Sequence, residues 1–132
     1  MKYPVAPVED RTWHGRTYGS KAEMLHAQQL RLRLAQGDLV VLLEQPRLWL
    51  GVPENVYVPD FFTLDKDGVA EFVDVKGVET PKFKRDKKLW KSYGMVPLRI
   101  VRKGRTVAVV DGGGRDGTLP TRDSCSLGSG GC

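Results

Sequence analysis

The sequence has little cysteine and no long hydrophobic run. Its two cysteines, Cys125 and Cys132, both lie within the last eight of 132 residues. This placement excludes a disulfide framework in the body of the protein and a zinc site built on cysteine. No stretch approaches the roughly 18 apolar residues of a membrane span, and the N-terminal MKYPVAPVEDRTW lacks the apolar region of a secretory signal. We therefore expect a cytoplasmic protein that has no membrane partner.

The composition fits one small folded domain followed by a tail. Hydrophobic residues make up 40% and charged residues 28% of the sequence, which is ordinary for a globular protein. A chain of this length can bury a core without disulfides but cannot hold two substantial domains. Stretch 112–132 contains seven glycines and only two leucines as large apolar residues, too little to offset its chain entropy. We predict a folded domain at 1–111 and a flexible, glycine-rich tail at 112–132.

The excess positive charge is concentrated in one segment. The formal net charge is +5, and segment 82–91 (KFKRDKKLWK) contains six basic residues and one acid. The rest of the sequence has fifteen basic and fifteen acidic residues. A localised positive field favours a polyanionic partner such as nucleic acid. A solvated helix face with no such partner is the alternative interpretation.

Turn and cap residues divide the folded part into strands and helices. Gly37 is typical of a helix end, Thr80-Pro81 of a helix start, and segment 66–68 (KDG) of a hairpin turn. The predicted elements are a hairpin at 11–19, a helix at 21–36, strands at 39–50 (interrupted by a proline), 55–64 and 69–76, a helix at 81–93, and strands at 96–102 and 105–111. This order predicts an α/β fold with a mixed β-sheet flanked by helices.

Two neighbouring strands bring acidic residues together. In the strand at 69–76, Asp74 and Lys76 share one face, while Val73 and Val75 point toward the presumed core. Asp60 lies in the preceding predicted strand, and hairpin pairing can bring it close to Asp74. Close carboxylates repel each other, and a bound cation such as Mg²⁺ or Mn²⁺ relieves the repulsion. The alternatives are a surface ion pair between Asp74 and Lys76 and a turn role for Asp60.

Glu23 is a third candidate acid. At 100° per residue it shares a helix arc with Ala27, Leu30 and Leu34, which predicts that it faces inward, toward the sheet. Segment 20–23 (SKAE) also fits a capping box, in which the glutamate side chain bonds only the N-cap amide. The local sequence leaves both roles open.

The order of these motifs resembles the PD-(D/E)xK nuclease superfamily. A helix that begins with S-x-x-E is followed by Pro59-Asp60, then by Asp74-Val75-Lys76, and then by a basic helix. The sequence more closely resembles phage-encoded endonucleases of the Holliday-junction resolvase type in the segments YGSKAE (18–23), EQP (44–46), YVPDF (57–61) and VDVKG (73–77). The resemblance covers most of the folded part. It implies a restriction-endonuclease-like core, a nuclease domain at 1–111 and, for a phage protein, a place in the host cytoplasm.

The resemblance also implies a reaction and a set of catalytic residues. The reaction is Mg²⁺-dependent hydrolysis of DNA phosphodiesters, with Mn²⁺ able to substitute, and the substrate is branched DNA, most specifically four-way junctions. Asp60, Asp74 and the Val75 carbonyl would ligate the metal, and Glu23 would hold a second metal or its water shell. Lys76 would orient the attacking water and offset charge in the transition state.

The predicted helix at 81–93 is amphipathic. One arc carries Phe83, Leu89, Trp90 and Tyr93, which we assign to the core. The opposite arc is the predicted DNA-binding face and consists of Lys84, Arg85, Lys87, Lys88 and Lys91.

The helix at 21–36 has a second apolar side, formed by Leu25 and Leu32. Such a helix is either buried on two sides or used in an interface. A four-way junction requires two cuts, which a twofold dimer can supply, and the resemblance also implies a homodimer. The alternative functions are a related nicking or repair endonuclease of the same fold, and a non-catalytic nucleic-acid-binding module. A binding module would have no use for the acids and the lysine together.

Overall fold

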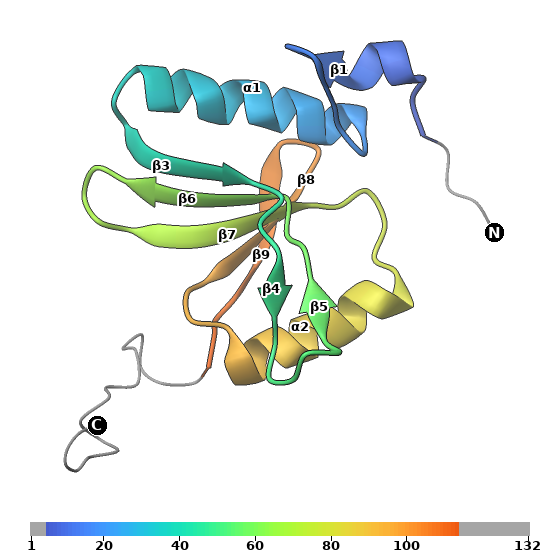
Figure 1. Ribbon diagram of the computed structural model, residues 1–132, viewed down its shortest axis with the longest axis vertical. Coiled ribbons are helices and arrows are strands. Elements are labelled where there is room, and N and C mark those ends of the chain that lie inside the picture. Colours follow the sequence, from blue (N-terminus) through green and yellow to red (C-terminus); the bar gives the residue numbers. More distant parts are fainter. Residues whose placement is uncertain (1–4, 114–132) are drawn as a thin grey trace.

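A computed structural model describes residues 5–113, in which a central sheet carries one long helix on each face (Figure 1). The N-terminal part contains the 3-10 helix η1 (Val8–Arg11), strands β1 (Thr12–Trp13) and β2 (Arg16–Thr17), and helix α1 (Lys21–Ala35). The middle part contains β3 (Leu39–Glu44), β4 (Leu48–Trp49), β5 (Val56–Tyr57), β6 (Phe61–Asp65) and β7 (Ala70–Val75). The last part contains α2 (Pro81–Tyr93), β8 (Leu98–Arg102) and β9 (Arg105–Val110).

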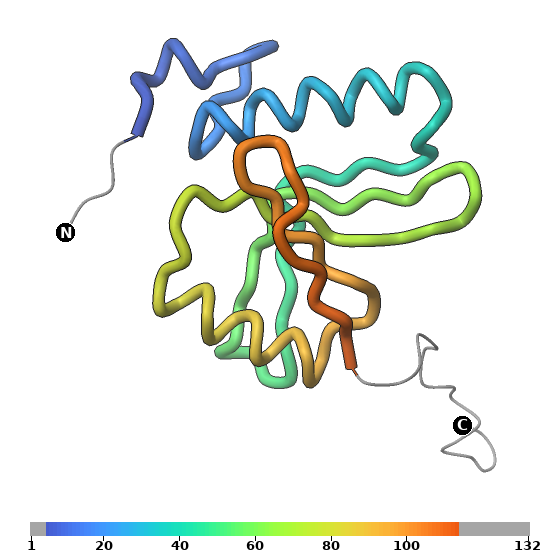
Figure 2. Tube along the Cα trace, turned by 180° about the vertical axis from the view of Figure 1, so that it is seen from behind, coloured from blue at the N-terminus to red at the C-terminus, as the bar shows by residue number. Residues whose placement is uncertain are grey.

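The central sheet is mixed. Its strand order is β3-β6-β7-β8-β9, and neighbours are antiparallel except for β7 and β8, which are parallel and joined through α2. Helix α1 covers one face and α2 the other, as the front and back views show (Figures 1 and 2). The short hairpins β1–β2 and β4–β5 form separate two-stranded sheets. The predicted α/β architecture with a mixed sheet flanked by helices is therefore confirmed.

Strand β7 is buried on both faces because each helix packs against one of them. Toward α1, Val73 and Val75 belong to the core, as predicted. Toward α2, Phe72 packs against Trp90 with ring centroids 5.1 Å apart. The face that carries Asp74 is therefore enclosed by protein rather than open to water.

The helices begin and end where local signals predict. The Glu23 N–H donates to Ser20 Oγ at 3.1 Å, and the Phe83 N–H donates to Thr80 Oγ1 at 3.1 Å. Each of these bonds satisfies a backbone donor that has no partner within the helix. After α1, Gly37 adopts a φ of +85°, a left-handed conformation that glycine reaches without steric cost.

The predicted single strand at 55–64 is wrong, because the chain forms two strands in different sheets. Strand β5 ends at Tyr57 and β6 begins at Phe61. Pro59 between them has no N–H to donate to a sheet. The carboxylate of Asp60 accepts the Val75 N–H at 2.7 Å, and its carbonyl accepts the Gln45 N–H at 2.8 Å. Asp60 therefore lies in the connection before β6, held from both sides by backbone groups.

Two predicted core residues are exposed. Leu34 is 40% exposed, whereas Leu39 at the start of β3 is buried in the core. Tyr93 is 54% exposed, and its ring lies against Gly51 in the connection between β4 and β5. Periodicity alone places both residues on buried arcs, but each belongs to the last turn of its helix.

The predictions on membrane spans and on the C-terminal tail depend on which residues the structure describes. Within residues 5–113, no helix combines the length and the apolar character that a membrane crossing requires. Residues 114–132, which include most of the predicted tail and both cysteines, lie outside the described part.

Candidate active site

The fold brings Glu23, Asp60, Asp74 and Lys76 together. Glu23 comes from the first turn of α1, Asp60 from the connection before β6, and Asp74 and Lys76 from the end of β7. Asp60 interacts with both Glu23 and Asp74, and Lys76 Nζ lies 3.5 Å from Asp74 Oδ1. They come from three separate segments, and pairing of β6 with β7 under α1 makes them neighbours.

Asp74 is the most deeply buried member of the group, with 1% of its surface exposed. The Tyr57 hydroxyl donates to its Oδ2. Its Oδ1 has no hydrogen-bond partner, and the Lys76 ammonium forms an ion pair with it at 3.5 Å. A surface ion pair, one of the alternatives raised by the sequence, is therefore excluded for Asp74. Leaving a charged oxygen without a hydrogen bond in a buried place is costly, so this atom is suited to a ligand.

Burial and mutual repulsion shift the protonation of the acids. Burial raises the pKa of Asp60 far above its usual range, and the nearby Asp74 and Glu23 raise it further. Burial also raises the pKa of Glu23, with a smaller contribution from the charge of Asp74. Because the pKa values of Asp60 and Glu23 are raised, a bound cation would compete with protons for these two carboxylates.

Of the two roles that the sequence leaves open for the Glu23 side chain, the structure supports the inward one. The Glu23 backbone N–H completes the cap with Ser20, as described above. Its side chain does not simply close a capping box, because it interacts with the Gly19 backbone N–H and with Asp60. A side chain on Gly19 would place its Cβ 2.9 Å from Glu23 Oε1. Glycine at this position therefore lets the carboxylate lie directly against the backbone.

Lys76 is held by two contacts. Its Nζ pairs with Asp74 and lies 4.6 Å from the centroid of the Phe83 ring on α2. Its side chain is 30% exposed, so the ammonium group is still accessible to a ligand in solvent. A cation fixed between a carboxylate and an aromatic face is well placed to meet a second anionic group.

The donor set fits a hard cation such as Mg²⁺. The available groups are carboxylate and carbonyl oxygens, and Asp74 Oδ1 is an orphaned buried acceptor. Among residues 5–113, no three His, Cys, Asp or Glu side chains are grouped closely enough to surround one ion by themselves. Mg²⁺ is usually bound through one or two carboxylates together with waters and substrate phosphates. A cation held here by one or two carboxylates would need waters or a substrate to complete its coordination.

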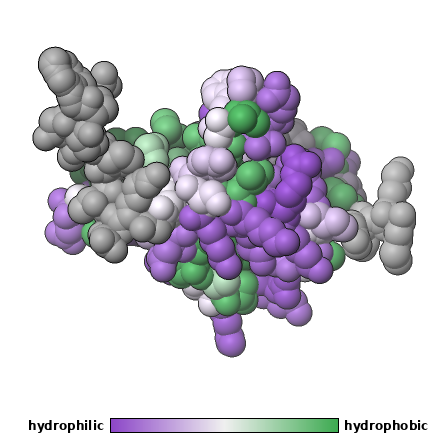
Figure 3. All heavy atoms as spheres, turned by 90° about the horizontal axis from the view of Figure 1, so that it is seen from below, coloured by the Kyte–Doolittle hydropathy of each residue, from purple (hydrophilic) through white to green (hydrophobic). Residues whose placement is uncertain are grey.

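Helix α2 places a row of lysines beside the edge strand β9. A groove with a volume of about 760 Å³ runs between them, and the view from below shows hydrophilic side chains gathered over this side of the molecule (Figure 3). Its lining consists of Lys84, Lys87, Lys88, Lys91 and residues 108–111.

The residues of the predicted DNA-binding face lie in different surroundings. Lys87 is only 27% exposed and is paired with Glu79, so its charge is not free. Arg85 is exposed but is not part of the groove lining. Lys84, Lys88 and Lys91 line the groove and form no ion pair within the described part of the chain. The helical spacing of three or four residues places these three on one stripe, whereas Arg85 lies about 60–120° away from them.

Sequence reasoning missed Tyr57. Its hydroxyl contacts Asp74, and its ring packs against Trp90 with centroids 5.9 Å apart. An aromatic residue in a short strand is most often a core residue, and Tyr57 is indeed 3% exposed. Its polar function depends on a partner 17 positions further along the chain, and no local pattern reveals that partner.

The fold and the site define a mixed α/β protein with a buried carboxylate cluster beside a basic helix. The chain belongs to the DUF1064 family, whose model, described as "Protein of unknown function (DUF1064)", matches residues 2–107. Comparisons with curated proteins and with solved structures find no match. The family description assigns no activity.

Proposed function

We propose that this protein is a Mg²⁺-dependent endonuclease with a restriction-endonuclease-like core that resolves four-way DNA junctions. The observation that carries the proposal is the buried Asp74, whose Oδ1 has no hydrogen-bond partner and which lies between Asp60 and Lys76. Such a cluster destabilises the fold unless a ligand occupies it, and strongly perturbed acids concentrate at functional sites.

The residues of the cluster would divide the work of phosphodiester hydrolysis. Asp60, Asp74 and the Val75 carbonyl would hold Mg²⁺, and Glu23 would hold a second ion or its water shell. Bound Mg²⁺ polarises a phosphate oxygen and makes hydroxide available near neutral pH. Lys76 would orient the attacking water and offset the negative charge that develops on the phosphate.

The groove between α2 and β9 is the proposed path of the DNA backbone. Lys76 and Lys87 both lie over the Phe83 ring, at 4.6 and 5.5 Å from its centroid, so the lysine row begins next to the cluster. From there the groove follows Lys84, Lys88 and Lys91 along the helix. Phosphate contacts of this kind position a nucleic acid without reading its sequence, as selection by shape requires.

A homodimer is part of the proposal. Leu25 and Leu32 on α1 are 45% and 58% exposed, so the second apolar side of this helix is uncovered within one chain. Resolution of a four-way junction requires cuts in two strands. Two symmetric copies would present one equivalent site to each of them. Sedimentation should give a dimer at micromolar concentration, and a monomer that still resolves junctions would contradict this part of the proposal.

The test is a gel assay with a labelled four-way junction, a matched linear duplex and a Y-fork. Each substrate is incubated with Mg²⁺, with Mn²⁺ and with EDTA, using the wild-type protein and the Asp74→Ala variant. Asp67→Ala is the matched control, because Asp67 is an exposed aspartate in the β6–β7 hairpin, outside the cluster. We expect paired nicks in the junction alone, which disappear with EDTA and in Asp74→Ala but not in Asp67→Ala.

The other outcomes separate the alternatives. Cutting of the fork or the duplex as well would support nuclease activity but favour a nicking or repair enzyme of the same fold over a junction resolvase. Binding of DNA without cutting in any divalent metal would favour a non-catalytic binding module. Cleavage by Asp74→Ala at the wild-type rate would overturn the assignment of the site.

A further inference from the structure

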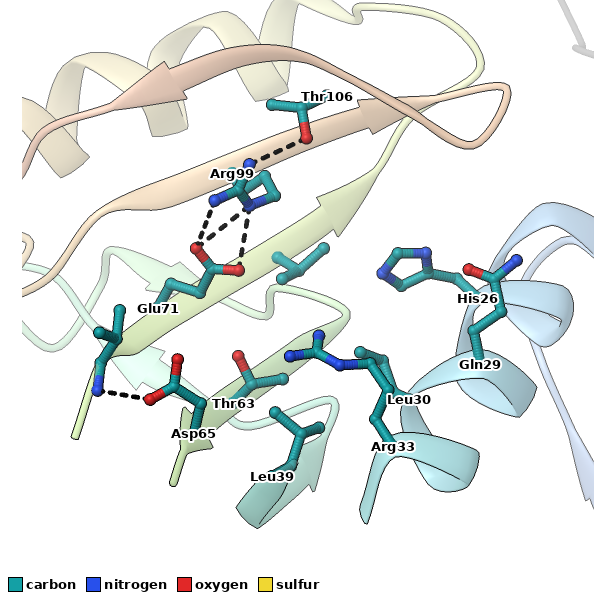
Figure 4. Close-up of a pocket in the computed structure, with 12 residues that line it drawn as sticks. His26, Gln29, Leu30, Arg33, Leu39, Thr63, Asp65, Glu71, Arg99 and Thr106 are labelled. Carbon is teal, nitrogen blue, oxygen red and sulfur yellow. Dashed lines mark hydrogen bonds and ion pairs between the residues drawn. The ribbon is translucent and has the colours of Figure 1, made fainter. Parts of the chain in front are cut away.

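A second polar pocket lies on the α1 face of the sheet, outside the carboxylate cluster. It has a volume of about 340 Å³, at the low end of small-ligand sites, which span roughly 300–1,000 Å³. Figure 4 shows His26, Gln29 and Arg33 reaching into it from α1, opposite side chains of the sheet. None of its lining residues belongs to the proposed catalytic set.

The carboxylates around this pocket are already engaged. Glu71 accepts from Arg99, whose Nε lies 3.0 Å from Oε2 and whose terminal nitrogen lies 2.9 Å from Oε1. Arg99 also donates to Thr106 at 2.9 Å. Asp65 Oδ1 accepts two backbone N–H groups of the β6–β7 turn, both at 2.9 Å. Glu71 is therefore paired with an arginine, whereas Asp65 is held by backbone groups through its Oδ1.

The free groups of the pocket are mainly donors. Among residues 5–113, the Arg33 side chain forms no ion pair or hydrogen bond, so the five N–H donors of its guanidinium are available. Thr63 is 4% exposed, its hydroxyl has no hydrogen-bond partner in the described part of the chain, and it points into the pocket (Figure 4). The His26 ring faces the same space. The free donors of Arg33 and Thr63 suit a ligand rich in acceptors.

We propose that this pocket binds a small phosphate-bearing anion, held by Arg33, Thr63 and His26. The arginine fork matches two phosphate oxygens, and a charge-assisted hydrogen bond of this kind is stronger than one between neutral groups. The threonine hydroxyl and an imidazole N–H supply further donors to the remaining oxygens. The phosphate group comes either from a free anion or from a nucleic-acid backbone, and the two sources are separated by the test below.

His26 provides a direct readout of binding. Burial lowers the pKa of His26, the positive charge of Arg33 lowers it further, and Glu71 opposes the shift. The ring is therefore neutral at pH 7, and an anion bound beside it stabilises the imidazolium form. Occupation of the pocket should raise the His26 pKa.

The experiment is an NMR titration of the full chain at constant ionic strength, with inorganic phosphate in one arm and a short DNA duplex in the other. His26 ring signals are followed in the wild type, in Arg33→Gln and in Thr63→Val. Arg47→Gln is the matched control, because Arg47 is an exposed arginine outside the pocket. We expect saturable phosphate shifts at His26, a raised His26 pKa, and affinity weaker by about tenfold in Arg33→Gln but unchanged in Arg47→Gln.

Each outcome decides the proposal. Shifts at His26 with duplex alone, lost in Arg33→Gln, would identify the backbone as the source of the same phosphate group. Equal affinity in Arg33→Gln and wild type would overturn the proposal that this pocket binds phosphate. The absence of a His26 shift in both arms, in protein whose spectrum shows it to be folded, would overturn it as well.

Discussion

The Tyr57 hydroxyl donates a hydrogen bond to the buried carboxylate of Asp74, which links the β4–β5 hairpin to the end of β7. Burial raises the pKa of Tyr57, and the charge of Asp74 raises it further, so the phenol keeps its proton and stays a donor. The bond uses Asp74 Oδ2 and leaves Oδ1 without a hydrogen-bond partner. Tyr57 therefore orients the acid that our proposal places at the centre of catalysis.

Replacing Tyr57 with phenylalanine tests this positioning role. The ring still fills its place against Trp90, but Asp74 Oδ2 loses its donor. We expect the free energy of unfolding to fall by about 1.5–3 kcal/mol, the range for a lost hydrogen bond to a charged group. Chemical denaturation measures that loss, and the Mg²⁺ concentration needed for half-maximal cleavage should rise. Wild-type stability together with wild-type metal dependence would show that the bond has no such role.

Asp60→Asn should stabilise the protein when no divalent metal is present. The folded state raises the pKa of Asp60, so it keeps a proton that the unfolded chain releases above about pH 4. This contribution to stability is complete below that pH and declines as pH rises toward the raised folded value. Asparagine removes the charge and keeps an acceptor for the Val75 N–H. We expect a gain of about 1 kcal/mol or more at pH 7, since one pKa unit corresponds to about 1.4 kcal/mol.

Thermal unfolding with and without Mg²⁺ checks the same substitution. The wild type should gain stability from Mg²⁺, because a ligand that binds only the folded state raises its stability. Asp60→Asn should gain much less, and the control Asp67→Asn should behave like the wild type. An equal Mg²⁺ response in Asp60→Asn and wild type would remove Asp60 from the metal site.

The groove lysines should determine how DNA binding depends on salt. If Lys84, Lys88 and Lys91 each neutralise one phosphate, the slope of log K against log salt contributed by them is about −2 to −3. Replacing all three with glutamine should remove that part of the slope and weaken binding. Arg85→Gln, on the same helix but outside the groove lining, should change the slope little. Fluorescence anisotropy at several salt concentrations measures the affinity and the salt slope of each variant. An Arg85→Gln effect as large as that of the triple variant would contradict the proposal that the DNA backbone follows the groove.

His26 should make stability decline in mild acid. Burial lowers its pKa in the folded state, and the charge of Arg33 adds to the effect. As pH falls below about 6.5, the unfolded chain binds a proton that the folded protein does not bind, so stability falls. The contribution is fully present above that pH. Melting curves between pH 5 and 8 should show a smaller decline in His26→Gln, whereas replacing the exposed His14 should leave the wild-type profile unchanged.

The candidate site shows which predictions local sequence supports. The spacing of Asp74 and Lys76 correctly places them together, and the hairpin signal at 66–68 correctly predicts that Asp60 approaches Asp74. The inward arc of Glu23 is also correct, although the same periodicity wrongly buries Leu34. Periodicity describes a helix as if its whole length were covered, whereas the sheet beneath it has a limited extent.

The sequence by itself determined the ends of the helices and the turns, because these depend on backbone groups within a few residues of each other. Ser20 and Thr80 cap the starts of their helices, and Gly37 ends the first one, through contacts and backbone angles that are local. The tertiary structure alone decided that β7 is covered on both faces and that the Tyr57 hydroxyl donates to Asp74. Those properties arise from contacts between distant segments, which form only when the sheet and both helices close around the same strand.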